Sequence, residues 1–135
     1  MKNILFLALF ISFIVFLMSL SLFFYYTLPV KVYSFQASVR VTEDLGGFDL
    51  NSSALTFGSI AFGGSSTRSI LVNNSYSFPV RVEPIIKGNI GQIIAYSSMI
   101  VQPNNSSSFQ LSVFAGPNVS LGNYTGNVFI RLLRV

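Results

Sequence analysis

Residues 4–24 read ILFLALFISFIVFLMSLSLFF, a run of 21 residues without a charged side chain. A helix needs about 20 apolar residues to cross a hydrocarbon core of roughly 30 Å, so the run has the length of a membrane span. Aromatic residues occupy positions 23–26, where an aromatic belt would meet the lipid headgroups. Pro29 cannot continue a helix. The sequence therefore predicts one transmembrane helix over residues 4–26.

The charges on either side of this run bear on its orientation. Lys2 lies in the short flank formed by residues 1–3, and Lys31 lies on the other side. The positive flank favours an N-terminus in the cytoplasm and a C-terminal domain outside it, although Lys31 weakens this bias. We therefore expect a single-pass protein of the cell membrane whose C-terminal domain lies outside the cytoplasm.

A cleaved signal peptide is the alternative interpretation of the same run. Ser19 and Ser21 have the small side chains and the spacing of a processing site. The apolar core of a signal peptide is usually about 7–15 residues long, which is shorter than this run. An uncleaved signal anchor is therefore the preferred interpretation, whereas cleavage would make the domain a secreted one.

The composition of the chain argues against several classes of function. Lys and Arg total 8 and Asp and Glu total 4, which gives a net charge of +4, but the basic residues are scattered and predict no nucleic-acid surface. The sequence contains no Cys and no His, which excludes a disulfide framework, a His-based catalytic triad and the usual zinc and copper ligands. We expect no enzyme, no cofactor and no small-molecule substrate.

Most of the acidic residues fall in one expected loop, at Glu43, Asp44 and Asp49. Oxygen ligands of this kind can hold a hard cation such as calcium. Their spacing fits no EF-hand loop, and solvated turn residues are the simpler interpretation. The sequence therefore predicts neither a metal site nor catalytic residues here.

Residues 33–42 read YSFQASVRVT, in which apolar and polar side chains alternate strictly. A period of two is typical of a strand with one buried face. Shorter runs of this kind follow, separated by Gly, Pro and Asn, and we expect strands at 54–57, 67–73, 79–86, 93–96, 99–101, 107–114 and 124–133. About seven or eight strands predict an all-β fold, an antiparallel β-sandwich over residues 33–135, joined to the helix by a linker at 27–32.

Two residues carry more specific expectations. Pro84 lies inside a predicted strand, which indicates a sheet edge or a bulge because proline lacks the N–H group of a ladder. Tyr124 begins the last strand directly after a loop. A tyrosine in that position can turn its hydroxyl back to the upstream backbone, so we predict a structural corner there, with a plain core tyrosine as the alternative.

The sequence also contains the N-x-[ST] pattern of glycosylation acceptors at several predicted turns and strand ends. Surface glycosylation would agree with a domain outside the cytoplasm. Because Asn and Ser both favour turns, the pattern can also arise for purely structural reasons. The candidate acceptors are Asn51, Asn73, Asn104, Asn105, Asn118 and Asn123.

Residues 54–133 carry motifs with a recognisable rhythm. The motifs are Leu55-Thr-Phe-Gly-Ser-Ile60, Gly63 and Ser65, a strand at 69–74 that ends in Asn, a turn at 103–108 and a strand start at 122–126. They resemble a broad Ig-like group that includes major-sperm-protein-like modules and the Ig-like repeats of bacterial and archaeal surface proteins. The resemblance implies an Ig-like β-sandwich, and such modules mostly bind proteins, space other domains or build surface assemblies.

The plan of one helix and one sandwich also resembles the anchored accessory proteins of the archaellum and the type IV pilin-like subunits. The chain departs from pilins because no basic leader precedes the apolar run. We therefore expect a membrane-tethered module that binds another surface or membrane protein or itself. The alternatives are a filament subunit that donates strand 33–42 to a neighbour, and a secreted module. Apolar residues out of phase with the inward face are candidates for a partner surface: Phe48, Phe78, Phe114 and Phe129.

Overall fold

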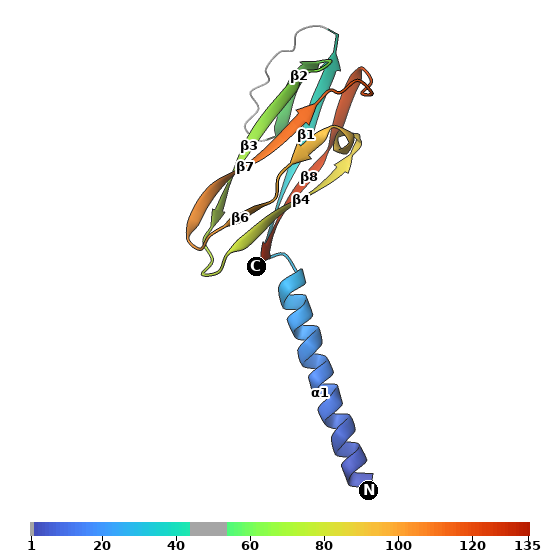
Figure 1. The fold of residues 1–135 in the computed structure, drawn as a ribbon, viewed down its shortest axis with the longest axis vertical. Helices are drawn as coiled ribbons and strands as arrows, with labels where there is room; N and C mark the ends of the chain where they lie inside the picture. Colours follow the sequence, from blue (N-terminus) through green and yellow to red (C-terminus); the bar gives the residue numbers. More distant parts are fainter. Residues whose placement is uncertain (1, 44–53) are drawn as a thin grey trace.

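The computed structural model describes residues 2–43 and 54–135 and consists of one long helix followed by a strand domain (Figure 1). The helix α1 covers Lys2–Thr27, and a short 3₁₀ helix η1 covers Asn89–Gln92. The strands are β1 (Lys31–Thr42), β2 (Leu55–Ala61), β3 (Ser65–Asn74), β4 (Val80–Gly88), β5 (Ile94–Tyr96), β6 (Met99–Val101), β7 (Asn105–Phe114) and β8 (Gly122–Arg134).

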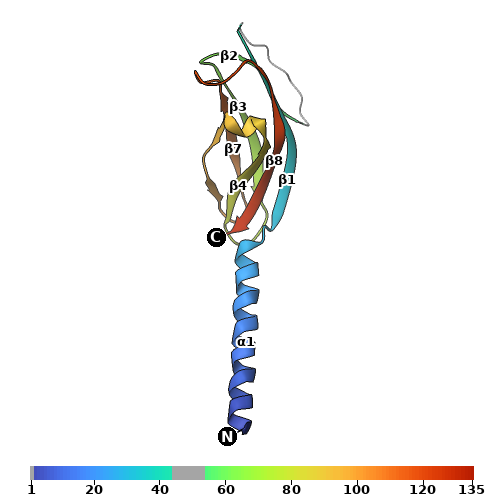
Figure 2. The same cartoon turned by 90° about the vertical axis from the view of Figure 1, so that its right-hand side faces the viewer.

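The strands form two sheets packed face to face, which confirms the predicted β-sandwich after one helix. The larger sheet has five strands in the order β2-β1-β8-β4-β6, and the smaller has three in the order β3-β7-β5. Figure 2 shows the two layers side by side, with β1 and β8 in one and β3 and β7 in the other. The core lies between them.

The alternation in the sequence explains which side chains form this core. In β1, Ala37, Val39 and Val41 are buried at every second position. The inward side chains of β7 and β8 meet them from the facing and neighbouring strands; the buried ones are Phe109, Leu111, Val113, Tyr124, Val128, Ile130 and Leu132. Burial of one such side chain is worth about 1.5–3 kcal/mol, so these rows supply much of the free energy of folding.

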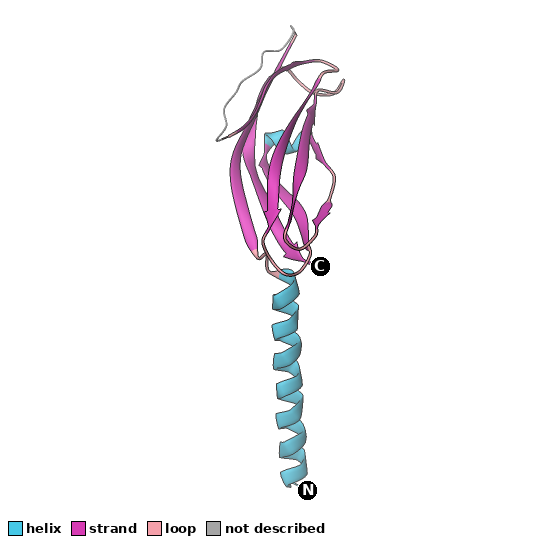
Figure 3. Cartoon of the chain, turned by 90° about the vertical axis from the view of Figure 1, so that its left-hand side faces the viewer, coloured by secondary structure: helices cyan, strands magenta, loops and turns pink. Residues whose placement is uncertain are grey.

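The helix α1 has the properties of a membrane span. It is long and apolar enough to cross a bilayer, none of it is buried against the domain, and Figure 3 shows it leaving the strands as a single helix. An N-terminal signal sequence can satisfy the same criteria of length and composition. The helix begins and ends close to the predicted bounds, but β1 begins at Lys31, so the predicted linker at 27–32 is shorter, consisting of residues 28–30.

The sandwich departs from the predicted antiparallel pattern at one pair of strands. β1 and β2 are parallel, from Ala37 opposite Leu55 to Thr42 opposite Ala61, whereas every other pair of described strands is antiparallel. Parallel neighbours require a connection of about a dozen residues or more, and residues 43–54 provide one. The sequence pattern gives the buried face of a strand but not its direction.

The strand predicted at 54–57 extends further than the sequence indicates, through Gly58 to Ala61. The register between β1 and β2 shifts next to Gly58, whose φ of 75° is favourable for glycine. β2 continues to Ala61 past this bulge. The position of Pro84 fits the expected sheet edge. β8 pairs with β4 along its whole length, but β6 pairs with the other side of β4 only from Val80 to Val82, before Pro84.

A pair of glycines allows β4 and β8 to approach each other closely. Gly88 lies directly opposite Gly126 in the register. A Cβ atom on Gly126 would overlap the carbonyl oxygen of Lys87 and lie 2.8 Å from Cγ2 of Ile90. The contact with backbone leaves no flexible group that could move aside.

We therefore predict that Gly126→Ala destabilises the domain by about 2–3 kcal/mol through overpacking. The measurement is the free energy of unfolding of the full chain in detergent, from urea titration followed by circular dichroism. Gly63→Ala is a suitable control, because its φ of 75° is strained for alanine but nothing lies within 4 Å of the added Cβ. Equal losses for both variants would contradict the close approach.

Candidate functional site

The outer faces of the two sheets differ sharply in charge. On the five-stranded sheet, Glu83 accepts from Arg81 at 3.4 Å and from Arg131 at 3.2 Å. The ammonium group of Lys87 lies 5.4 Å from the ring centroid of Phe129 on the same face. This outer face therefore carries the mixed charges of an ordinary solvated surface.

Among the residues that the structure describes, the outer face of the three-stranded sheet carries no charged side chain. We call it the uncharged face, and it consists of the outward residues Ser65, Thr67, Ser69, Leu71, Asn73, Ala95, Ser106, Ser108, Gln110, Ser112 and Phe114. The one charged residue of β3, Arg68, turns inward instead, where its Nε donates to the carbonyl oxygen of Thr56 at 2.7 Å.

Hydroxyl groups of the uncharged face hydrogen-bond across the strands. The hydroxyl groups of Thr67 and Ser112 are 2.8 Å apart, and Ser106 donates to the side-chain oxygen of Asn73 at 3.3 Å. Two large apolar side chains interrupt the polar surface: Leu71 is 73% exposed and Phe114 is 51% exposed. The face therefore consists mainly of hydroxyl and amide groups, with two large exposed apolar side chains.

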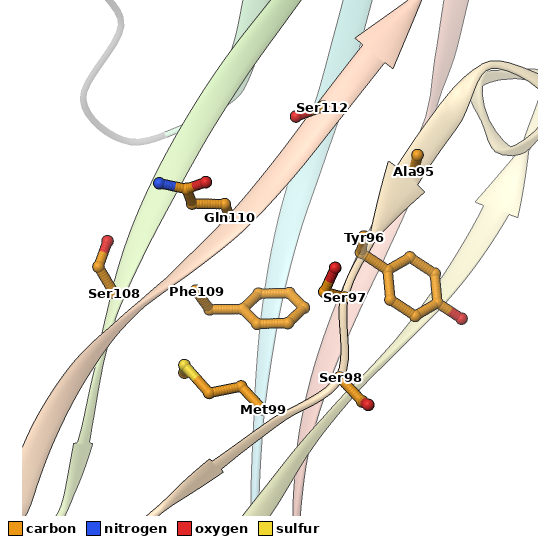
Figure 4. A pocket seen from close by; sticks show the side chains of 9 residues that line it. All are labelled: Ala95, Tyr96, Ser97, Ser98, Met99, Ser108, Phe109, Gln110 and Ser112. Atoms are coloured by element: carbon orange, nitrogen blue, oxygen red, sulfur yellow. The ribbon is translucent and has the colours of Figure 1, made fainter.

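A groove opens at one edge of this face, where the chain crosses from one sheet to the other between β5 and β6. β5 pairs with β7 only from Val113 to Leu111, so β7 has no described strand partner on that side towards its start. The groove has a volume of about 330 Å³. Figure 4 shows Phe109 and Met99 between β7 and the crossing segment, with Ser108, Gln110 and Ser112 along β7.

The groove combines hydrogen-bonding and apolar side chains. Its described lining contains serines, one glutamine, Met99 and two aromatic residues, with no carboxylate and no cationic group. Tyr96 is 49% exposed, and its ring centroid lies 6.5 Å from that of Phe109. These groups can donate and accept hydrogen bonds and cover apolar surface.

A second structured region is the junction between the helix and the sandwich. The guanidinium of Arg134 donates to the carbonyl oxygen of Tyr25 at 3.0 Å and lies 3.9 Å from the centroid of its ring. It also lies 5.0 Å from the ring of Phe78. A cation that caps a carbonyl oxygen in the last turn of a helix is favourable, because this end carries the negative pole of the helix dipole.

The backbone between helix and strand is also bound to the sandwich. The N–H group of Val30 donates to the carbonyl oxygen of Leu132 at 2.8 Å. The hydroxyl group of Tyr76 donates to the carbonyl oxygen of Val30 at 3.3 Å, and the Tyr76 ring stacks on Phe78 with centroids 5.1 Å apart. The connection is therefore a set of specific contacts rather than a free tether.

Asn74 is the polar residue on which this end of the sandwich depends, a role that the sequence pattern does not reveal. Its side chain is fully buried, and its amide nitrogen donates to the carbonyl oxygens of Phe78, Val101 and Gln102 at 2.9, 3.0 and 3.1 Å. Its side-chain oxygen accepts from the N–H group of Tyr76 at 3.0 Å. One residue thus satisfies the backbone of two separate loops.

The candidate glycosylation acceptors that the structure describes are all exposed. Asn73, Asn104 and Asn105 lie at the end of the sandwich nearest α1, because Asn105 pairs with Asn74 where β3 ends and β7 begins. Asn118 and Asn123 lie at the opposite end, where β8 begins. Asn51 lies outside the described residues.

Tyr124 turns back as the sequence predicts for a corner. Its hydroxyl group donates to the carbonyl oxygen of Ser120 at 2.9 Å and accepts from the N–H group of the same residue at 3.1 Å. The ring is buried in the core. This reciprocal contact fixes the loop before β8.

The aromatic residues proposed for a partner surface are scattered. Phe114 lies on the uncharged face, Phe129 lies on the charged face beside Lys87, and Phe78 lies in the helix junction. Phe48 lies outside the described residues. The structure therefore brings no two of the described ones together, and only Phe114 belongs to a larger surface.

The acidic loop is largely beyond what the structure describes. Glu43 follows the last residue of β1, and Asp44 and Asp49 lie outside the described residues. Within residues 2–43 and 54–135, no three acidic side chains gather in a way that could hold a metal ion.

Comparison with known proteins adds no relative: no family model, no curated protein and no solved structure matches the chain.

We predict that Asn74→Ala destabilises the domain by about 2–4 kcal/mol, because it leaves several buried backbone groups without partners. The measurement is the urea midpoint of the full chain in detergent. The matched control is Asn73→Ala, an exposed neighbour whose loss should cost no more than about 0.5 kcal/mol. Similar midpoints for the two variants would contradict the role of Asn74.

Proposed function

We propose that the chain is a membrane-anchored, non-enzymatic protein of the cell surface whose extracytoplasmic sandwich binds another protein through the uncharged face. The observation that carries this proposal is the absence of charge from the whole described outer face of one sheet, while the other carries Arg81, Glu83, Lys87 and Arg131. Cores of protein interfaces are depleted in charge in the same way, because unpaired charges are costly to remove from water.

The size of this face indicates a weak contact. β3 and β7 have 10 residues each, which corresponds to about 33 Å at the rise of an extended strand. Three strands at about 4.8 Å spacing make a surface about 10–14 Å wide, so the face offers roughly 300–450 Å². Stable interfaces use about 800 Å² on each partner, and the groove beside β7 is the adjoining surface that can extend the contact.

The contacts at the junction support the proposal of a partner that lies beside the protein at the membrane. Arg134, Tyr76 and Val30 bind the helix end to the sandwich. The strands run roughly along the direction of α1 in Figures 1 and 2, so the uncharged face is turned sideways. A neighbouring membrane protein, a surface layer or a second copy fits this orientation.

The finer aspects of this proposal rest on the sequence. The motifs between residues 54 and 133 support an Ig-like module of the bacterial or archaeal surface-protein type. Glycosylation would be compatible with the exposure of the five described acceptor residues. An uncleaved signal anchor is favoured over a secreted module by the length of the apolar run.

We expect a photoreactive amino acid at Gln110 to give a covalent adduct of defined mass in native membranes. The matched control places it at Asn127, an exposed uncharged position on the other sheet. Adducts are measured by mass spectrometry after purification of the full chain. Equal adducts from both positions, or adducts from Asn127 alone, would contradict binding through the uncharged face.

A filament subunit is the second candidate, in which β1 would leave its own domain and complete the sheet of a neighbour. The position of β1 between β2 and β8 favours the tethered module, because exchange would break pairing on both sides. We expect residues 31–135, expressed alone, to be monomeric by light scattering. Polymers that persist on dilution, together with stabilisation of residues 44–135 by an added peptide of residues 33–42, would favour the filament subunit.

A further inference from the structure

A cavity of about 390 Å³ lies at the junction between α1 and the sandwich. The last two turns of the helix and residues 28–30 form one side, and Tyr76 and Arg134 form the other. If α1 spans the membrane, this end of the helix lies at the level of the lipid headgroups, because aromatic residues occupy positions 23–26. The cavity would then open where lipids are.

One cationic side chain, Arg134, lines the cavity, and a second, Lys31, follows the lining residues in the sequence. Arg134 uses one of its N–H groups on the carbonyl oxygen of Tyr25, and its buried Nε has no hydrogen-bond partner. Lys31 follows directly after the residues that line the cavity, and its ammonium group lies 4.7 Å from the ring centroid of Tyr33. The Tyr33 side chain raises the pKa of Lys31 above its usual value, so this group is cationic at neutral pH.

Neither of these cations has an acidic partner among the described side chains. The ion pairs found in residues 2–43 and 54–135 join Arg81 and Arg131 to Glu83. Glu43 follows the far end of β1, whereas Lys31 begins it. Lys31 and Arg134 are therefore two cations next to the helix end that form no ion pair with a described carboxylate side chain.

Part of the lining is apolar. Phe24 and Leu28 contribute to it, and both side chains are exposed. A ligand that fits the cationic and the apolar lining carries a phosphate group and a hydrocarbon chain. A phospholipid has this structure, whereas a soluble anion would leave the apolar part in water.

We propose that the junction binds an anionic phospholipid, with its phosphate at Arg134 and Lys31 and one acyl chain along Phe24 and Leu28. This inference rests on the proposed membrane anchoring and deepens it, because it assigns a lipid partner to the point where the sandwich meets the membrane. Two uncompensated cations favour a headgroup with net negative charge over a zwitterionic one.

The test uses the full chain in detergent with equal amounts of phosphatidylglycerol and phosphatidylcholine that have the same acyl chains. Native mass spectrometry measures the ratio of the two bound lipids. We expect the anionic lipid to be bound about fivefold more than the zwitterionic one for each effective cation, as estimated from about 1 kcal/mol per basic residue near an anionic surface. Arg134→Gln should lower this ratio about fivefold.

Lys31→Gln is the second variant, because it removes a charge without touching the contact between Arg134 and Tyr25. It should lower the ratio by several fold while leaving the unfolding midpoint unchanged. Arg81→Gln is the matched control at the same end of the sandwich, where Glu83 already compensates the charge. A ratio of one in the unmodified chain, or an equal loss in Arg81→Gln, would overturn the proposal.

Two further measurements distinguish a lipid site from a site for soluble anions and test the membrane anchoring. Excess inorganic phosphate should not displace the bound lipid, and displacement would identify a site for soluble anions instead. Alkaline extraction of native membranes tests the anchoring itself. Release of the chain would overturn both the anchoring and the lipid site, whereas a retained chain without lipid preference would overturn the lipid site alone.

Discussion

Strand β8 is the element on which the rest of the structure depends. It pairs with β1 from Lys31 to Val41 and with β4 from Val80 to Gly88, so it holds the centre of the larger sheet. Its inward residues Val128 and Ile130 are fully buried. A small domain without Cys cannot use disulfides, and this burial must take their place. Because β8 ends at Arg134, the strand that holds the core together also holds the sandwich on the helix.

Most of the fold could be predicted because it depends on local patterns. The alternation of residues 33–42 identifies the buried face of β1 from neighbours in the sequence alone. The parallel direction of β2 could not be predicted in this way, because direction depends on the pairing of strands that are distant in the sequence. The role of Asn74 was missed for a related reason, since its partners at Val101 and Gln102 are distant in sequence.

The candidate site could be predicted only in part from the sequence. The outward positions of β3 and β7 lack charge in the sequence, but they form one surface only once the two strands are known to be neighbours. The aromatic residues that are out of phase with the inward face predicted the partner surface less well. Phe78 and Phe129 lie beside Arg134 and Lys87, and long cationic side chains commonly cover apolar rings in this manner. An aromatic residue that the sequence pattern places outward can therefore be covered by a neighbouring side chain.

The scarcity of acidic residues connects these surfaces. Glu83 compensates two arginines on the outer face of the larger sheet, which leaves that face solvated, and the described part of the smaller sheet presents no charge outward. Two further cations, Lys31 and Arg134, lie next to the helix end. In the proposed membrane-bound state, a junction that fixes orientation would make a small binding face effective, because partners confined to one membrane meet at high effective concentration. The weak contact expected from the area of the face would then allow reversible association.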